Sequence, residues 1–324
     1  MSGPDDSLTE PDWTEPEWSD AGPAPRRIRR ARRAPVEPVR GRTAAIAAVV
    51  ATVVVVGSIA AAVGTPTPAL APPVAEGVAV SPVGAYSSSA FCAAGTGTAA
   101  STTVYLTNST RSAVAGVMTS VGPAGSGGAV PTVRRRVSVP ALASLAVNPA
   151  DGLPAGSNAT AFAFSGGGVV ATQAVSGPNG WSTAPCAARI ASEWAFAGGA
   201  TTAGNTLTLS LFNPAATEAV VNVSFLTGAG VVTPQQYQGL VVPPGQLVEE
   251  NVGDYVLNAT DIATLVAAQA GGLVSTEFQQ ASSGATGGVS LRLGSPQLST
   301  TWRLAQTTVL LHSTVDLTLA NPGP

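Results

Sequence analysis

Segments in which apolar and polar residues alternate recur along the chain from about residue 86 onward. Residues 103–107, 207–211 and 220–225 show this alternation, and clusters of Gly, Pro, Asn and Ser separate such segments every 8–12 residues. A period of two is typical of half-buried strands, and this spacing of turn residues is typical of an antiparallel sandwich or barrel. Residues 261–268 fit a buried strand as well as a helix. The pattern therefore predicts an all-β region with little helix.

One uninterrupted apolar stretch, residues 43–63, precedes the β-rich region. Its 21 residues contain no charge and no Pro, and a helix needs about 20 such residues to cross the hydrocarbon core of a bilayer. The stretch predicts a single transmembrane helix that holds the chain in the lipid bilayer. A cleaved signal peptide with its cleavage site at residues 69–71 is the alternative, but its apolar core would be shorter and nearer to the N-terminus.

Charge predicts the orientation of this helix. Eight Arg residues lie on its N-terminal side, and the next Arg on the other side is Arg111. The positive-inside rule places the N-terminus in the cytoplasm and the C-terminal region outside the cytoplasmic membrane, in a single-pass arrangement. Residues 1–42, in which acids and Pro precede the Arg cluster, are predicted to be a disordered cytoplasmic tail. Residues 64–85 are rich in Pro and Ala and are predicted to be an extended linker.

An internal duplication is marked first by three Asn residues in the β-rich region. Asn108, Asn213 and Asn321 each follow a similar strand pattern, and they lie 105 and 108 residues apart. Trp194 and Trp302 precede the second and the third Asn by the same 19 residues. Residues 168–173 also match residues 272–277 at an offset of 104. A recurring period of this kind indicates repeated structural units.

These matches predict the domain organisation. A unit of about 105 residues has room for six or seven strands, which is the size of an immunoglobulin-like antiparallel sandwich. We expect one such repeat at residues 86–190, a second at residues 191–298 and a partial third at residues 299–324. A lone strand leaves its hydrogen-bonding groups unpaired. The third repeat therefore either adds to a preceding sheet or belongs to a truncated form of a longer relative, and the sequence leaves both open.

The second repeat carries a recognisable pattern. It begins with the aromatic–Gly segment 194–199, continues with the Leu-rich strand and Asn-Pro of residues 207–214, and then has residues 223–230 and 241–245. This pattern resembles an uncharacterised family of actinobacterial membrane-anchored envelope proteins with β-rich repeats. The resemblance covers about residues 86–324 and implies a fold and a compartment, but no activity.

The repeated Asn and Trp residues have a structural and a functional interpretation. Asn after a strand starts a turn through its side chain, and a following Pro prevents the strand from continuing; a repeated ligand-binding Asn is the alternative. Trp194 and Trp302 are predicted to anchor the core or a strand end, and stacking on a carbohydrate is the alternative. Cys92 and Cys186 bracket the first repeat and are predicted to form a disulfide, because the compartment outside the membrane is oxidising.

Composition excludes several function classes. The 324 residues include fifteen basic residues, all of them Arg, together with eighteen acids, one His and two Cys. Walker-type phosphate loops and Schiff-base chemistry need Lys, and zinc sites need a larger His and Cys cluster. A nucleic-acid binder would be basic, whereas this chain has a net charge of −3. We expect no nucleic-acid partner, no cofactor and no metal, and we find no catalytic motif.

Two charged clusters remain as candidate sites. Glu249, Glu250, Asp254 and Asp261 form the densest acidic group, which is predicted to be a solvated loop, with a cation site or a catalytic pair as the alternative. Arg134, Arg135 and Arg136 form the basic run of the β-rich region. Charges of this kind protect an edge strand from aggregation, and contact with an anionic wall polymer is the functional alternative.

Three function hypotheses follow. The first is a membrane-anchored, non-enzymatic sandwich protein of the cell envelope that acts as a scaffold or binding module for an envelope protein or a surface glycan. The second is a transmembrane signalling protein whose residues 1–42 bind a cytoplasmic regulator. The third is a wall-polymer hydrolase or transferase that uses the acids of residues 249–261.

Overall fold

The structure is a computed structural model, and it describes residues 85–94, 96–125, 128–177, 180–282, 287–302 and 317–322. All of these residues belong to one compact unit that begins at Pro72. The predicted tail, the predicted transmembrane helix and all but the last residue of the predicted linker lie outside the described residues. Within the described part, no helix is long and apolar enough to cross a membrane.

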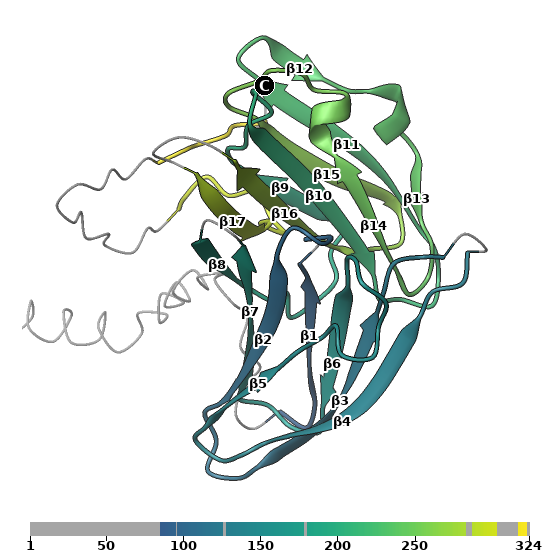
Figure 1. Cartoon of the computed structure of the whole chain (residues 1–324), viewed down its shortest axis with the longest axis vertical. Coiled ribbons are helices and arrows are strands. Elements are labelled where there is room, and N and C mark those ends of the chain that lie inside the picture. Colours follow the sequence, from purple (N-terminus) through teal and green to yellow (C-terminus); the bar gives the residue numbers. More distant parts are fainter. Residues whose placement is uncertain are drawn as a thin grey trace, which may run out of the picture. The chain divides into compact units, whose positions relative to one another are not determined.

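Eight strands form the first sandwich (Figure 1). Its two antiparallel sheets have the strand orders β1-β6-β3-β4 and β5-β2-β7-β8, and both contribute to one core. The strands are β1 (Ser88–Ala93), β2 (Ser101–Asn108), β3 (Val114–Val121), β4 (Thr132–Val139), β5 (Ser144–Val147), β6 (Ala159–Phe164), β7 (Val169–Gly177) and β8 (Gly180–Pro185).

Nine strands and two short 3-10 helices form the second sandwich. Its sheets have the orders β14-β10-β16-β17 and β12-β11-β15-β9, and β13 also pairs with β11. The elements are β9 (Glu193–Phe196), β10 (Asn205–Asn213), β11 (Ala219–Thr227), β12 (Gly230–Val232), η1 (Gln235–Tyr237), β13 (Leu240–Val242), β14 (Gln246–Asn251), η2 (Val252–Asp254), β15 (Ala263–Ala270), β16 (Val274–Ala281) and β17 (Gly288–Leu293).

The two sandwiches have the same strand order. β9, β10, β11, β15, β16 and β17 take the places of β1, β2, β3, β6, β7 and β8; β14 replaces β5, and β12 and β13 share the place of β4. The isolated bridges agree, because Phe91 pairs with Ala187 in the first sandwich and Ala195 pairs with Ser295 in the second. Each strand of the second sandwich therefore has a counterpart in the first.

Alternation along the strands builds the two cores. In β2, Val104 and Leu106 are fully buried, whereas Tyr105 between them is exposed. In β10, Leu207, Leu209 and Leu211 are fully buried on the core side. Burying such a side chain stabilises the fold by about 1.5–3 kcal/mol.

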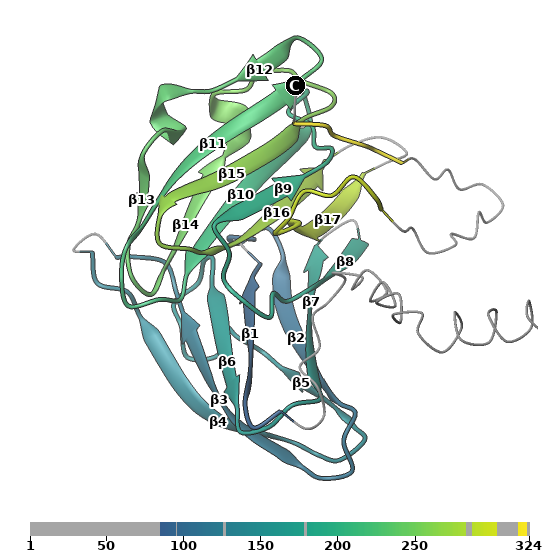
Figure 2. The same ribbon diagram turned by 180° about the vertical axis from the view of Figure 1, so that it is seen from behind.

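One face of the second sandwich covers the first. Ala93, Val121 and Ala159 of the first sandwich belong to the same cluster of buried side chains as the core of the second. The hydroxyl of Thr276 in β16 donates to the carbonyl oxygen of Ala93 in β1, and the backbone N–H of Leu291 donates to Ser182 Oγ at 3.0 Å. The strands labelled β8 and β17 lie side by side in both views (Figures 1 and 2).

The predicted all-β, antiparallel character is confirmed, and the described residues contain no α-helix. Residues 261–268, for which a helix was the alternative, mostly belong to β15. The sandwiches have eight and nine strands, more than the six or seven expected per repeat. The strands β5, β12 and β13 were missed because they are only three or four residues long. Strands this short show no clear alternation in the sequence.

Candidate functional site

The predicted disulfide between Cys92 and Cys186 is confirmed. It joins β1 to the residue that follows β8, and both cysteines are buried in the core of the first sandwich. The equivalent place in the second sandwich is taken by Phe196, which packs against Gly294 so closely that a Cβ on Gly294 would lie 2.7 Å from the ring. One sandwich is therefore closed by a covalent bond and the other by an aromatic ring.

The repeated Asn residues are structural. Asn108 is buried, and its Nδ2 donates to the carbonyls of Ser112, Val139 and Pro140 at 2.8–3.1 Å. Its Oδ1 accepts from the backbone N–H and the hydroxyl of Thr110 at 2.8 and 2.7 Å. The side chain thereby forms the turn after β2 and fixes it to the end of β4.

Asn213 repeats this arrangement in the second sandwich. Its Nδ2 donates to Thr217 O at 2.8 Å and to Val242 O at 2.9 Å, and its Oδ1 accepts from Ala215 N at 3.0 Å. These contacts use both hydrogens of the buried amide, so the turn that it forms accounts for the recurrence of the Asn.

Trp194 and Trp302 have different environments. Trp194 is buried, and its Nε1 donates to Leu273 O at 2.9 Å, as expected of a core anchor. Trp302 is 57% exposed, and its Nε1 donates to Ser299 O at 3.0 Å. The expectation of a core position is therefore not met for Trp302.

The Arg run lies on β4, the edge strand of its sheet. Arg134, Arg135 and Arg136 are all exposed. Arg135 Nη1 lies 3.2 Å from Asp151 Oδ2, in an exposed pair of a kind that contributes at most about 1 kcal/mol. These positions fit protection of the sheet edge.

Of the acids proposed as a catalytic group, Glu250 and Asp254 lie close enough to affect one another, whereas Glu249 and Asp261 have other partners. Glu249 accepts a hydrogen bond from Ser157 of the first sandwich, and burial raises the pKa of Glu249. Glu250 is the next residue of the strand and points to the opposite face, where burial and Asp254 raise its pKa. Asp261 accepts from its neighbour Thr260 at 3.1 Å. Among the described residues, no three His, Cys, Asp or Glu side chains form a group that could hold a metal ion.

A buried ion pair lies in the core of the second sandwich. Glu277 of β16 is fully buried, and its Oε2 lies 3.1 Å from Nη2 of Arg292 in β17. Burial raises the pKa of Glu277 to about 7, although Arg292 and the hydroxyl of Thr264 pull it the other way. Its counterpart in the first sandwich is Gln173, which is also fully buried. A polar side chain therefore occupies this core position in both sandwiches.

Replacing Glu277 with Gln is expected to flatten the pH dependence of stability. Because the folded pKa of about 7 exceeds the ordinary 4.5, the folded state binds the proton more tightly, and stability falls as the pH rises between these values. The variant avoids this loss, so at pH 8 it should be more stable by up to about 3 kcal/mol. Urea unfolding at pH 5 and pH 8 measures the difference, with the exposed Glu218→Gln as control. An unchanged pH dependence would contradict the assignment.

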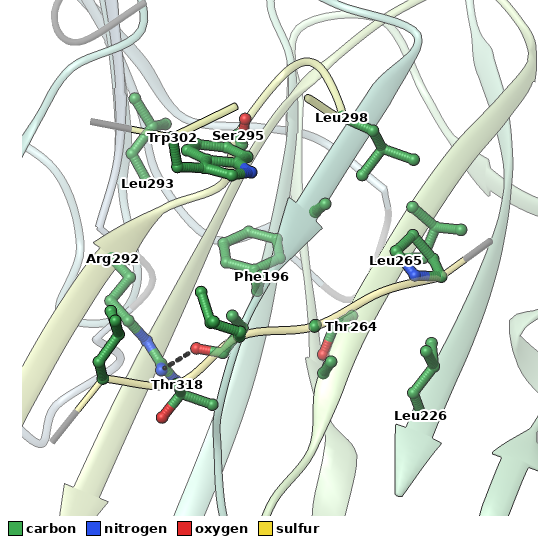
Figure 3. A pocket seen from close by; sticks show the side chains of 17 residues that line it. Phe196, Leu226, Thr264, Leu265, Arg292, Leu293, Ser295, Leu298, Trp302 and Thr318 are labelled. Carbon is green, nitrogen blue, oxygen red and sulfur yellow. Dashed lines mark hydrogen bonds between the residues drawn. The ribbon is translucent and has the colours of Figure 1, made fainter. Parts of the chain in front are cut away.

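A cavity of about 260 Å³ lies at the edge of the second sandwich where β9 and β17 meet. We call it the edge cavity. Its floor is formed by β9, β11, β15 and β17, with Phe196, Leu226 and Leu265 among the lining side chains, and Arg292 lies at one side. Figure 3 shows the ring of Trp302 close to that of Phe196, and Arg292 joined by a hydrogen bond to a neighbouring oxygen, which is the carbonyl of Ala197.

Two segments near the C-terminal end of the chain cover the edge cavity. They comprise residues 298–302 and 317–322, and their largest apolar side chains are only partly buried. The exposed fractions are 50% for Leu298, 57% for Trp302, 60% for Leu317 and 74% for Leu319. Apolar side chains are thus gathered around an apolar cavity and remain open to solvent.

The sequence predicted little of this site. Trp302 is the one candidate residue that lines the edge cavity; Trp194, the disulfide, the Arg run and the acidic group lie elsewhere. His312 lies outside the described residues. The internal repeat is the sequence signal that could have pointed to this site, because residues 317–322 repeat a pattern that is buried in the preceding copy.

Comparison with known proteins bears on the family. No curated protein and no solved structure matches the chain. Residues 150–324, more than half of the chain, match a family of unknown function, DUF5719. The match spans the later strands of the first sandwich, the whole second sandwich and the segments that cover the edge cavity. The protein therefore belongs to the DUF5719 family.

Proposed function

We propose that the protein is a membrane-anchored, non-enzymatic binding protein of the cell envelope, and that it holds a protein partner at the edge cavity. The observation that carries the proposal is that the internal repeat places an equivalent surface on each sandwich. The edge cavity is the counterpart of the face on which the first sandwich already binds a protein surface, the second sandwich.

The residue correspondence is direct. Around the Phe91–Ala187 bridge, the first sandwich presents small and apolar side chains that the second sandwich covers. Around the Ala195–Ser295 bridge, the second sandwich presents the equivalent strands to the edge cavity. Ala93, Val121, Ala159 and Ala161 of the first face correspond to Ala197, Leu226, Ala263 and Leu265 of the second.

The chemistry of the surface favours a protein over a glycan. The cavity walls are mostly apolar, and the guanidinium of Arg292 is already engaged by Glu277 and Ala197 O. Exposed apolar clusters of this kind mark protein-interaction surfaces. Among the acids of residues 249–261, Glu250 and Asp254 interact, but none of these acids lines the edge cavity.

Location outside the cytoplasm is supported by two features. The Cys92–Cys186 disulfide suits an oxidising compartment. The apolar residues 43–63 have the length and the flanking charges of a membrane anchor, although they lie outside the described residues.

A pull-down from detergent-solubilised membranes tests the proposal. The full chain is expected in the membrane fraction, and a chain without residues 43–63 in the soluble fraction. Both should capture the same envelope protein, because the proposed site lies far along the chain from the anchor. Capture that requires residues 1–42 would move the signalling hypothesis ahead, and the absence of any envelope protein from both samples would refute the binding role.

A further inference from the structure

The segment that covers the edge cavity repeats a central strand. Residues 317–321 carry the pattern of residues 209–213, the second half of β10, and in both cases Pro follows the final Asn. β10 is hydrogen-bonded on one side to β14 and on the other to β16. Its Leu209 and Leu211 are fully buried in the core between the two sheets.

The segment also lies beside the strand that is equivalent to the neighbour of β10 in the first sandwich. In the first sandwich, β1 is contacted by β10 and β16. In the second sandwich the counterpart of β1 is β9, and Thr318 lies against Gly198, just beyond the end of β9, at 3.3–3.4 Å from the place of a Cβ. This contact puts Thr318 beside the end of β9, as β10 lies beside β1.

Residues 317–320 differ from β10 in their backbone pairing. Within the described residues, no strand pairs with residues 317–320. Leu317 and Leu319, the counterparts of Leu209 and Leu211, are 60% and 74% exposed. The segment therefore presents two large apolar side chains, and a backbone outside the strand pairs of the described residues, beside an apolar cavity.

We infer that this surface binds its partner by strand addition: an extended segment of the partner protein pairs with residues 317–320 and places its side chains over the edge cavity. The inference rests on the proposed function and specifies how that partner is recognised. Main-chain hydrogen bonds supply affinity in this mode, and pockets for alternate side chains supply selectivity. The existing junction between the sandwiches is the precedent, because β16 pairs with β10 and contacts β1 in the same manner.

The counterpart strand defines the chemistry of the partner segment. β16 reads Val-Ser-Thr-Glu-Phe-Gln-Gln-Ala, and Val274, Thr276 and Phe278 share the face from which Thr276 donates to Ala93 O in the first sandwich. A partner segment with apolar or Thr side chains at every second position fits the edge cavity. A charged residue at one of these positions would lose its hydration against apolar walls.

A peptide with the sequence of β16, Val274–Ala281, is the probe. Binding of the labelled peptide to the full chain in detergent is measured by fluorescence anisotropy. We expect saturable binding that Leu319→Asp weakens at least tenfold. Leu257→Asp, which alters an equally exposed Leu of the same sandwich outside the edge cavity, should leave binding unchanged.

Two N-methylated peptides separate strand addition from simple filling of the cavity. Methyl groups on alternate amides block one edge of a strand, and shifting them by one residue blocks the other. We expect one series to abolish binding and the other to retain it.

Equal loss in both series, no saturable binding, or insensitivity to Leu319→Asp would overturn the inference. So would self-association of the full chain that Leu319→Asp abolishes while the peptide fails to bind, because it would assign the surface to a second copy. A positive pull-down with a negative peptide result would refute strand addition alone and leave the proposed function standing.

Discussion

Replacing both Cys92 and Cys186 with Ala is expected to lower the free energy of unfolding by about 3–5 kcal/mol. The disulfide closes a loop with a sequence separation of 94 residues, and in the chain-entropy model such a loop restricts the unfolded state by about this amount. Ala rather than Ser is the replacement, because both cysteines are buried among apolar side chains. Urea unfolding of the oxidised protein and of the variant gives the difference.

Hydrogen exchange locates this effect. The first sandwich should lose protection, whereas the core strands of the second should keep more of it, because Phe196 and Gly294 stand where the cysteines would be. Treatment of the wild-type protein with a reductant should reproduce the variant. Unchanged stability after loss of the disulfide would contradict its role as the closure of the first sandwich.

Replacing Asn108 or Asn213 with Ala is expected to cost about 3 kcal/mol or more. Each substitution leaves buried carbonyls without their donor, Val139 O in one case and Val242 O in the other. A buried polar group left unsatisfied costs about 1–3 kcal/mol. Asn213→Asp should be no better at neutral pH, because a carboxylate would face the carbonyls of Thr217 and Val242. Urea midpoints give the measurement.

An exposed amide near the end of the second sandwich supplies the control for this series. Gln297 is exposed, so Gln297→Ala should change stability by less than about 0.5 kcal/mol. A loss at Gln297 as large as that at Asn108 or Asn213 would contradict the assignment of these two buried amides to their turns.

The features that the sequence predicted are those with a local signal. Alternation in residues 103–107 and 207–211 fixed both the strand type and the buried face, because side chains of a strand point alternately to opposite sides. The repeated Asn was predicted as a turn former from its place after a strand, and the structure adds its bonds to Val139 O and Val242 O. The disulfide followed from the two cysteines and the expected compartment.

The features that the sequence missed depend on contacts between distant residues. Glu277 is the one acid of β16, but nothing near it in the chain points to Arg292, which reaches it from the neighbouring strand at 3.1 Å. The junction between the sandwiches involves residues such as Ala93 and Thr276, whose types are unremarkable in any strand. Pairing of this kind is a property of the assembled sheets.

Trp302 shows the limit of an argument from repeats. Its spacing from Asn321 equals that of Trp194 from Asn213, and both Trp residues were predicted to anchor the core or a strand end. Trp194 is enclosed by the sheets of its own sandwich, whereas Trp302 lies half open over the edge cavity. The repeat pattern identifies equivalent positions, but burial depends on whether the surrounding strands are present.

The most direct test of the account is photo-crosslinking from position 319 in intact cells. A photo-reactive amino acid in place of Leu319 should yield a covalent adduct with an envelope protein, and the same substitution at Leu257 should yield none. That pair of results would identify the edge cavity as the binding site and the partner in one step. No adduct from position 319, or the same adducts from both positions, would contradict the assignment of this surface as the binding site.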